Sequence, residues 1–364
     1  MKAKSITFIA VFLFSMSIFP IYNTLVNKTH NPVGVDEFSI RSLYNIDAVL
    51  SISGAAGNLL GISTDADKVF FGRDHWLFLG NNFNKPISKK IVGASGYDSD
   101  IHKTITAMDG WAALSRSIGG KGFYVMIGPD KDSIYTDMLP GWYRKNNDTI
   151  SQNLISGSNL YIDTPKYLML AKNESALPLY FKTDTHWNEL GAYEAFKGLI
   201  SKSEMNGDNL QWPSEKLNFV SLGTSNGDLS RFQRSGVFLS DTDVRITSPS
   251  VANIPISVIS YKSGKNIYAG LNESIESPRE ALLVRSPEAL NNTKVLWLRD
   301  SFGTSMSRIM ASTFSETLQI HHGRTSPEEI KKIMLNYKPD YVIVTVVERD
   351  DLGKMFSYNP SETN

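Results

Sequence analysis

An apolar run ends shortly before a serine, and a helical pattern follows, in Lys294-Val295-Leu296-Trp297-Leu298-Arg299-Asp300-Ser301-Phe302-Gly303. From here the chain alternates regularly, and the pattern predicts strands over 294–298, 317–321 and 341–347 with helices over 303–312 and 327–336. The second helix has a strong start signal in Ser326-Pro327-Glu328-Glu329, a capping box with proline at the first helical position. Strands that alternate with helices form a parallel sheet covered on both faces. Ligands of such α/β sheets bind beyond the carboxyl ends of the strands, where we expect Ser301 and the region of Arg349.

The middle of the chain adds further elements of both kinds. Apolar residues recur at helical spacing over 104–118 and again over 188–200, which predicts two amphipathic helices. Between them, 123–127 has the length and composition of a short buried strand. Residues 67–80 predict a strand, a turn and a second strand.

A less regular stretch lies between about 204 and 293. Ser, Asn, Gly and Pro are frequent there and the periodicity is poor, so we expect a loop-rich or β-rich insertion. We predict a single domain over 67–364, preceded by a stem over 27–66.

Composition excludes several classes of function. The chain has 364 residues with 37 basic and 37 acidic side chains, so its net charge is zero and no basic excess suggests nucleic-acid binding. Cysteine is absent, which excludes disulfides, thiolate catalysis and cysteine-ligated metal together. The motifs of phosphate loops and dinucleotide sites are also missing, so we expect no cofactor.

The N-terminus predicts a membrane anchor. Lys2 and Lys4 precede an uncharged stretch from Ile6 to Val26, which as a helix would be about 30 Å long and would cross a bilayer. A cleaved signal peptide is the alternative, but the residues after the apolar block lack a small-x-small cleavage site. We therefore expect residues 1–26 to be a signal anchor, with the lysines inside and the rest of the chain exported.

Two short motifs indicate acyl-transfer chemistry. Thr183-Asp184-Thr185-His186-Trp187-Asn188 places a carboxylate two residues before an imidazole, and Ser301 follows the strand described above. A serine hydroxyl needs a base to take its proton and a third group to orient that base, and His186 and Asp184 are the residue types for these tasks. Each motif alone also has a structural explanation, since Asp and His often occur together on surfaces and Ser301 could simply cap the helix that follows.

The two motifs together resemble those of the alginate O-acetyltransferases of the AlgJ and AlgX type, whose cell-envelope domain is similar to the SGNH hydrolases. The resemblance extends over roughly residues 67–350 and includes three further segments, Gly72 to Phe78, Ile127 to Lys131 with Tyr135 downstream, and Pro339 to Arg349. It implies an SGNH hydrolase-like α/β fold with a parallel sheet flanked by helices. It also implies that Ser301 is the nucleophile, His186 the base and Asp184 the orienting acid.

The chain departs from ordinary SGNH hydrolases in motif order and in one expected donor. The Asp-x-His block precedes the serine here, so the order is circularly permuted. Glu348-Arg349-Asp350 stands where those enzymes carry an asparagine that donates to the oxyanion, and the Ser301 N–H with a neighbouring loop is the substitute we consider.

Four further residues are candidate substrate-binding groups: Lys131, Tyr135, Trp187 and Arg349. A loop lysine is more often solvated than bound to a ligand, and a tyrosine is more often a packing residue. For a metal we expect no site, because the six histidines show neither His-x-x-x-His nor His-x-His spacing. His321 and His322 would point to opposite faces of a strand.

The resemblance implies O-acetylation of an exported polysaccharide through an acyl-serine. The catalytic domain would lie in the periplasm on a single-pass inner-membrane anchor, and a multi-spanning membrane acyltransferase would deliver the acetyl group. A polysaccharide acetylesterase with the same triad is one alternative. A non-catalytic polysaccharide-binding subunit is another, and the complete Ser–His–Asp set argues against it.

Overall fold

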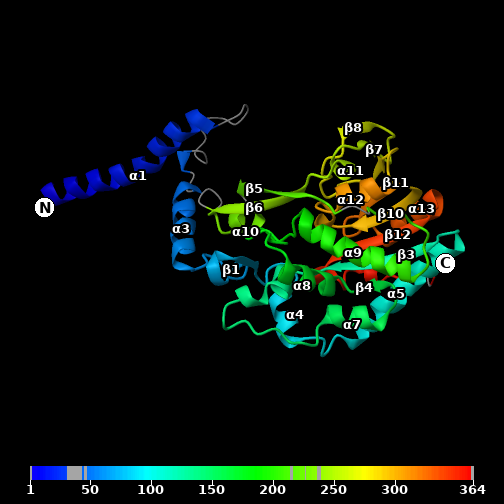
Figure 1. The fold of residues 1–364 in the computed structure, drawn as a ribbon. Coiled ribbons are helices and arrows are strands. Elements are labelled where there is room, and N and C mark those ends of the chain that lie inside the picture. Colours follow the sequence, from blue (N-terminus) through cyan, green and yellow to red (C-terminus); the bar gives the residue numbers. More distant parts are fainter. Residues whose placement is uncertain are drawn as a thin grey trace.

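The computed structural model describes residues 2–30, 43–44, 47–213, 216–225, 227–235 and 239–361. Its centre is an eight-stranded sheet in the order β4-β3-β12-β10-β11-β9-β7-β8 (Figure 1). The strands span β3 (Gly122–Gly128), β4 (Tyr161–Ile162), β7 (Pro255–Ser260), β8 (Asn266–Leu271), β9 (Leu282–Arg285), β10 (Asn291–Arg299), β11 (Phe314–His321) and β12 (Tyr341–Val347).

The first five strands of that order are parallel, as the alternating pattern predicts. The remaining three pair antiparallel to one another and to β11. These three come from the stretch between 204 and 293, which is therefore β-rich and widens the sheet. The same stretch forms a separate antiparallel hairpin, β5 (Phe219–Ser225) with β6 (Ser240–Ile246), and two short helices, α10 (Asp228–Phe232) and α11 (Pro249–Ala252).

Two hydrophobic layers cover the two faces of the sheet. Successive residues of β3 alternate between them, so Tyr124 and Met126 pack on one side while Val125 and Ile127 pack on the other. Both faces are buried, as expected for parallel strands. The first layer packs under α8 (Thr164–Glu174), α9 (Glu189–Met205) and α12 (Ser307–Thr313), and the second under α5 (Asp98–Ser117), α7 (Ile150–Gly157) and α13 (Pro327–Tyr337).

Capping explains where these helices begin. The side chain of Ser326 accepts a hydrogen bond from the Glu329 N–H, and Pro327 follows, so α13 begins where its sequence signal predicts. The helix predicted over 303–312 is shorter. A single turn, η4 (Ser301–Gly303), comes first, and α12 begins only at Ser307.

Two segments precede the sheet. A helix, α1 (Lys2–His30), contains a stretch from Ser5 to Leu25 that is long and apolar enough to cross a membrane, as a signal sequence would also be. Within the predicted stem, residues 47–60 form α3 (Asp47–Leu60), while residues 31–42 lie outside the described part.

The predicted strand–turn–strand is the hairpin of β1 (Val69–Phe71) and β2 (Leu77–Leu79). The remaining short elements are η1 (Arg73–His75), α4 (Pro86–Val92), α6 (Lys131–Ile134), η2 (Thr136–Met138), η5 (Glu348–Asp350) and η6 (Lys354–Ser357).

Candidate active site

Ser301 stands at the carboxyl end of β10, in the first position of the η4 turn. The side chain of Asp300 caps this turn by accepting a hydrogen bond from the Phe302 N–H at 2.8 Å. Its other oxygen accepts the Val347 N–H at 2.7 Å, which joins the turn to the end of β12. Asp300 rather than Ser301 is therefore the cap, and the Ser301 hydroxyl is left to bond elsewhere.

His186 is held at the entrance of α9. Asn188 caps that helix by accepting hydrogen bonds from the N–H groups of Leu190 and Gly191. Just before it, Tyr180 and Trp187 form a β-bridge that closes the intervening residues into a loop. Because the helix cap and the bridge fix both ends of the loop, Asp184 and His186 have defined positions.

The structure brings Ser301, His186 and Asp184 into one hydrogen-bonded line. The Nε2 atom of His186 lies 2.8 Å from the Ser301 Oγ, and its Nδ1 atom lies 2.6 Å from Asp184 Oδ1. That carboxylate oxygen also accepts the backbone N–H of His186 at 3.0 Å. These are the contacts a serine needs in order to lose its proton to an oriented imidazole.

The charges of the site favour a protonated His186. Burial opposes the imidazolium, but the hydrogen bond and charge of Asp184, together with the charge of Asp228, raise the pKa of His186 above its ordinary value of 6.5. For Asp184, burial likewise opposes ionisation, and the hydrogen bond and charge of His186 nevertheless lower its pKa well below the usual range. An ionised Asp184 therefore stabilises the imidazolium that forms when His186 accepts a proton.

Two carboxylates from the insertion support the Asp184 loop, and no local sequence pattern predicts them. Asp228, at the start of α10, accepts hydrogen bonds from the Thr185 N–H at 2.8 Å and the Thr185 hydroxyl at 2.6 Å. Its own N–H donates to Asp184 Oδ2 at 2.7 Å, and its carboxylate lies 3.8 Å from His186 Nδ1. Asp241, on β6, accepts from the N–H groups of Lys182 and Thr183. The insertion is thus part of the site's framework.

Lys131 supports the same loop from the opposite side. It is buried, and its ammonium donates to the carbonyls of Phe181, Lys182 and Asp184 at 2.7–3.0 Å. Burial lowers its pKa to about 8 against the opposing charges of Asp241, Asp184 and Asp228. The prediction that Lys131 is a solvated loop lysine is therefore wrong, because the side chain is buried. Lys131 is not among the residues that line the cavity beside Ser301, and its ammonium holds the carbonyl of Asp184.

Tyr135 and Trp187 also lie in the protein interior rather than on the wall of the cavity beside Ser301. The Tyr135 hydroxyl accepts the Leu179 N–H at 2.9 Å, and its ring stacks on Trp76 at 4.3 Å. The Trp187 indole is fully buried and donates to the Phe302 carbonyl at 2.7 Å. Both rings are buried, and neither lines the cavity beside Ser301.

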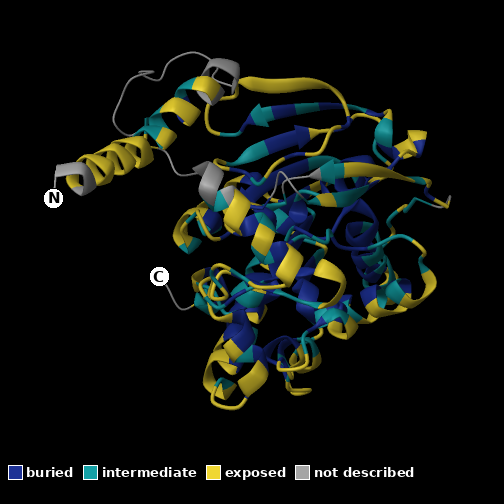
Figure 2. Ribbon diagram, turned by 90° about the vertical axis from the view of Figure 1, so that its left-hand side faces the viewer, coloured by how far each residue is buried: buried dark blue, intermediate teal, exposed yellow. Residues whose placement is uncertain are grey.

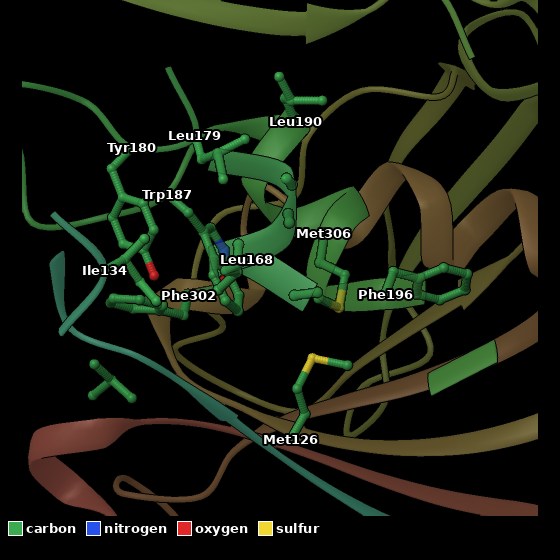
Figure 3. Close-up of a cluster of buried hydrophobic side chains, with 14 of the residues drawn as sticks. Met126, Ile134, Leu168, Leu179, Tyr180, Trp187, Leu190, Phe196, Phe302 and Met306 are labelled. Atoms are coloured by element: carbon green, nitrogen blue, oxygen red, sulfur yellow. The ribbon is translucent and has the colours of Figure 1, made fainter. Parts of the chain in front are cut away.

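The side chains of Trp187 and Phe302 pack against each other in the core next to Ser301 and His186. Their ring centroids are 5.0 Å apart, and Figure 3 shows them in the cluster that also contains Tyr180 and Leu179. Gly128, at the end of β3, makes this packing possible, since a Cβ there would stand 2.7 Å from Phe302. The contact connects the motif around His186 to the motif around Ser301.

Arg349 differs from the other three candidates because it lines the same cavity as Ser301. Its guanidinium lies 5.7 Å from the centre of the Phe302 ring and pairs with Asp130. Asp130 in turn belongs to a buried charge cluster, which we define as Lys90, Asp130, Asp132, Glu348 and Arg349. In this cluster, Glu348 turns inward and accepts from the Asp130 N–H at 2.9 Å, so it does not take the place of the missing oxyanion donor.

A cavity of about 780 Å³ opens beside Ser301 at the carboxyl ends of β10, β11 and β12. This is the edge of the sheet that the strand order predicts for a ligand site. His321 and His322 both line the cavity, which corrects the expectation that they point to opposite faces. Because β11 ends at His321, the period-two alternation of a strand does not extend to His322. The volume lies in the range of pockets that hold small ligands or a short part of a polymer.

Asp184, His186 and Asp228 are the described residues that approach the geometry of a metal site, with one ligand atom each within 4.8 Å of the others. Both ring nitrogens of His186 already face hydrogen-bonding partners, Asp184 and Ser301. This arrangement suits proton transfer better than metal ligation.

The sheet, with a Ser–His–Asp line at the carboxyl edge of its parallel strands, is that of an SGNH hydrolase-like domain. Residues 69–237 match the family model described as the SGNH hydrolase-like domain of the acetyltransferase AlgX, which confirms the resemblance predicted from the motifs. Over this span, which is less than half of the chain, the protein is thus similar to the acetyltransferase domain of AlgX. The matched span contains Asp184 and His186, while Ser301 lies beyond it.

Solved structures of low sequence identity share the fold. PatB1 of Bacillus cereus, solved with a sulfonyl adduct, is 14% identical with a TM-score of 0.58, over 79% of this chain and 98% of that one. A DHHW family protein of Eubacterium siraeum is 13% identical with a TM-score of 0.55, over 81% and 95%. The O-acetyltransferase domain of Pseudomonas putida AlgJ is 16% identical with a TM-score of 0.50, over 81% and 96%. The comparison with curated proteins finds no match.

Proposed function

We propose that the chain is an O-acetyltransferase that moves an acetyl group through an acyl-Ser301 to hydroxyls of an exported polysaccharide. The observation that carries the proposal is the Ser301 Oγ, 2.8 Å from His186 Nε2 and beside an open cavity, in an AlgX-type domain. The name of the AlgJ structure, an O-acetyltransferase domain, supports the reaction class.

In the first half-reaction, His186 Nε2 takes the proton of Ser301 as Oγ attacks the acetyl carbonyl of the donor. Asp184 stabilises the resulting imidazolium, which then protonates the leaving group of the donor. The negative oxygen of the intermediate needs donors. The Ser301 N–H at the start of η4 and the Arg349 cation on the cavity wall are the groups we assign to it.

In the second half-reaction, a sugar hydroxyl enters the cavity and His186 removes its proton. The sugar oxygen attacks the acetyl-serine, the acetyl group moves to the sugar, and His186 returns a proton to Ser301 Oγ. No metal or cofactor is needed for either half. The anchor proposed for residues 1–26 would hold the domain on the periplasmic side, near a multi-spanning membrane acyltransferase that supplies acetyl groups.

The proposal is tested by the fate of the acetyl group. We expect the purified protein, given a small acetyl ester and an acetyl-free oligosaccharide, to place acetyl groups on sugar hydroxyls, and gene deletion to lower acetylation of the exported polymer. Mass spectrometry of the oligosaccharide and the polymer measures both. If the polymer of the deletion strain is instead more acetylated, the protein is an acetylesterase, and the transferase proposal is wrong.

The raised pKa of His186 predicts the pH dependence of the first half-reaction. His186 acts as a base only when neutral, so kcat/KM for an acetyl ester should fall as the pH drops through a midpoint above 6.5. Asp184→Asn should lower that midpoint and reduce the rate by about a thousand-fold, because it removes the charge that stabilises the imidazolium.

Asp228→Asn is the matched variant for this test. The Asp228 carboxylate lies 3.8 Å from His186 Nδ1 and contributes charge without a hydrogen bond to the imidazole. Its removal should therefore lower the midpoint of the pH profile by less than Asp184→Asn does. A midpoint that is the same in all three proteins would contradict the assignment of His186 as the titrating base.

A further inference from the structure

The helix α3 presents a stripe of apolar side chains to solvent. Ile52 is 64% exposed, Leu59 is 80% exposed and Leu60 is 72% exposed. Residues seven and eight positions apart lie on one face of a helix, so the three side chains share a face. Ile62, just past the end of α3, is 61% exposed and extends the patch. We call these four residues the α3 patch. Figure 2 looks onto the side of the molecule that contains α3 and shows its outer face exposed.

The opposite side of α3 is fixed to the domain, so the helix cannot turn its apolar face inward. Gly54 lies so close to the Gln233 backbone that a Cβ would collide with its carbonyl oxygen. Asn58 is buried, and just beyond the helix the Ser63 hydroxyl donates to the Gln233 side chain at 3.1 Å. The patch is therefore a stable feature of the surface.

The start of α3 lies next to the outer end of the candidate membrane span. That span runs from Ser5 to Leu25, and near its end the Asn23 side chain donates to the Leu43 carbonyl at 2.8 Å. Leu43 precedes α3 by only four positions. In Figure 1, α1 and α3 lie on the same side of the domain and run in different directions. If α1 crosses the bilayer, α3 therefore begins beside the membrane surface.

We propose that α3 is an interfacial helix and that lipid covers the α3 patch. A helix of this kind lies with its apolar face at the boundary between headgroups and acyl chains. The occupant follows from continuity with the span, because the lipid next to Leu25 is the apolar phase nearest to the patch. The sequence of α3 contains one charged residue, Asp47, and no lysine or arginine, so its attraction to the membrane is hydrophobic. The inference rests on α1 being retained, and it is independent of the chemistry at Ser301.

The absence of cysteine makes the proposal easy to test on the full chain. Leu59→Cys, labelled with an environment-sensitive fluorophore, is reconstituted in phosphatidylcholine vesicles. We expect its emission to be quenched by nitroxides on the lipid and protected from aqueous iodide. The matched control is Lys103→Cys, at an exposed position of α5, a helix that Figure 1 labels well away from α3, and it should show the reverse.

Each other outcome overturns the proposal. If iodide quenches the Leu59 probe as strongly as the Lys103 probe, the patch is in water. If the probe is protected from both quenchers, a second copy or another protein covers it. An intact mass that lacks residues 1–26 would remove the anchor on which the inference depends.

A second variant separates lipid contact from folding. Ile52→Ser with Leu60→Ser, in the Leu59→Cys background, should move the probe back into contact with iodide by weakening the apolar stripe. The unfolding temperature in detergent should change little, since these side chains are mostly exposed. Unchanged lipid quenching in this triple variant would contradict the role of the stripe.

Discussion

Replacing Ser301 with alanine is expected to reduce acetyl transfer by at least about a thousand-fold, because the residual rate would depend on binding and charge stabilisation alone. The fold should survive, since the hydroxyl makes its hydrogen bond to His186 while Asp300 caps the turn. Initial rates with a small acetyl ester and an oligosaccharide acceptor measure the loss, and circular dichroism checks the fold.

A neighbouring serine supplies the control. Ser305 stands four positions later and donates to the Trp187 carbonyl at 3.0 Å, so Ser305→Ala should cost at most a few-fold. His186→Ala should resemble Ser301→Ala, and the double variant should be no worse than either, because the residues act as one unit. Near-normal turnover in Ser301→Ala or His186→Ala would show that the nucleophile or the base is misassigned.

The largest effect on stability is expected from Lys90→Met. Lys90 is buried, and its ammonium lies 2.6 Å from Asp132, 3.1 Å from Asp130 and 3.2 Å from Glu348. Its removal leaves three buried carboxylates with Arg349 as the remaining cation of the cluster. Breaking a buried ion pair from one side costs about 3–5 kcal/mol, so the free energy of unfolding should fall by about that amount. Chemical denaturation monitored by tryptophan fluorescence measures the change.

Two comparisons make this prediction specific. Lys103→Met, at an exposed position of α5, should change the free energy of unfolding by less than about 0.5 kcal/mol. Glu348→Gln in the Lys90→Met background should recover part of the loss, because it removes one of the uncompensated charges. If Lys90→Met is as stable as the unaltered chain, the ion pairs of Lys90 do not stabilise the fold as predicted.

The C-terminal half of the sheet was predictable because its signals are local. Each strand there is a buried apolar run, and Ser326 with Pro327 marks the start of α13. The position of Ser301 followed from the same pattern, as the first polar residues after a buried strand lie at the carboxyl edge of the sheet. The pairing of Ser301 with His186 was a hypothesis from residue types that the motif resemblance strengthened, since no periodicity connects residues 115 positions apart.

The supporting groups were not predictable because their roles are set by tertiary contacts. Asp228 and Asp241 come from a stretch without clear periodicity, and each reaches the Asp184 loop across more than forty residues. Lys131 has the sequence context of a surface turn, yet three backbone carbonyls surround its ammonium. Nothing in the local sequence distinguishes a lysine that meets carbonyls from one that meets water.

The most direct test of the central proposal is capture of the acyl-enzyme. The full-length protein is incubated with a small acetyl ester in the absence of acceptor, quenched in acid, digested and analysed by mass spectrometry. The mechanism predicts one acetyl group on the peptide that contains Ser301, and its loss when an oligosaccharide is added before the quench. An acetyl group on a different residue, or turnover of the ester in Ser301→Ala at the normal rate, would contradict an acyl-Ser301 mechanism.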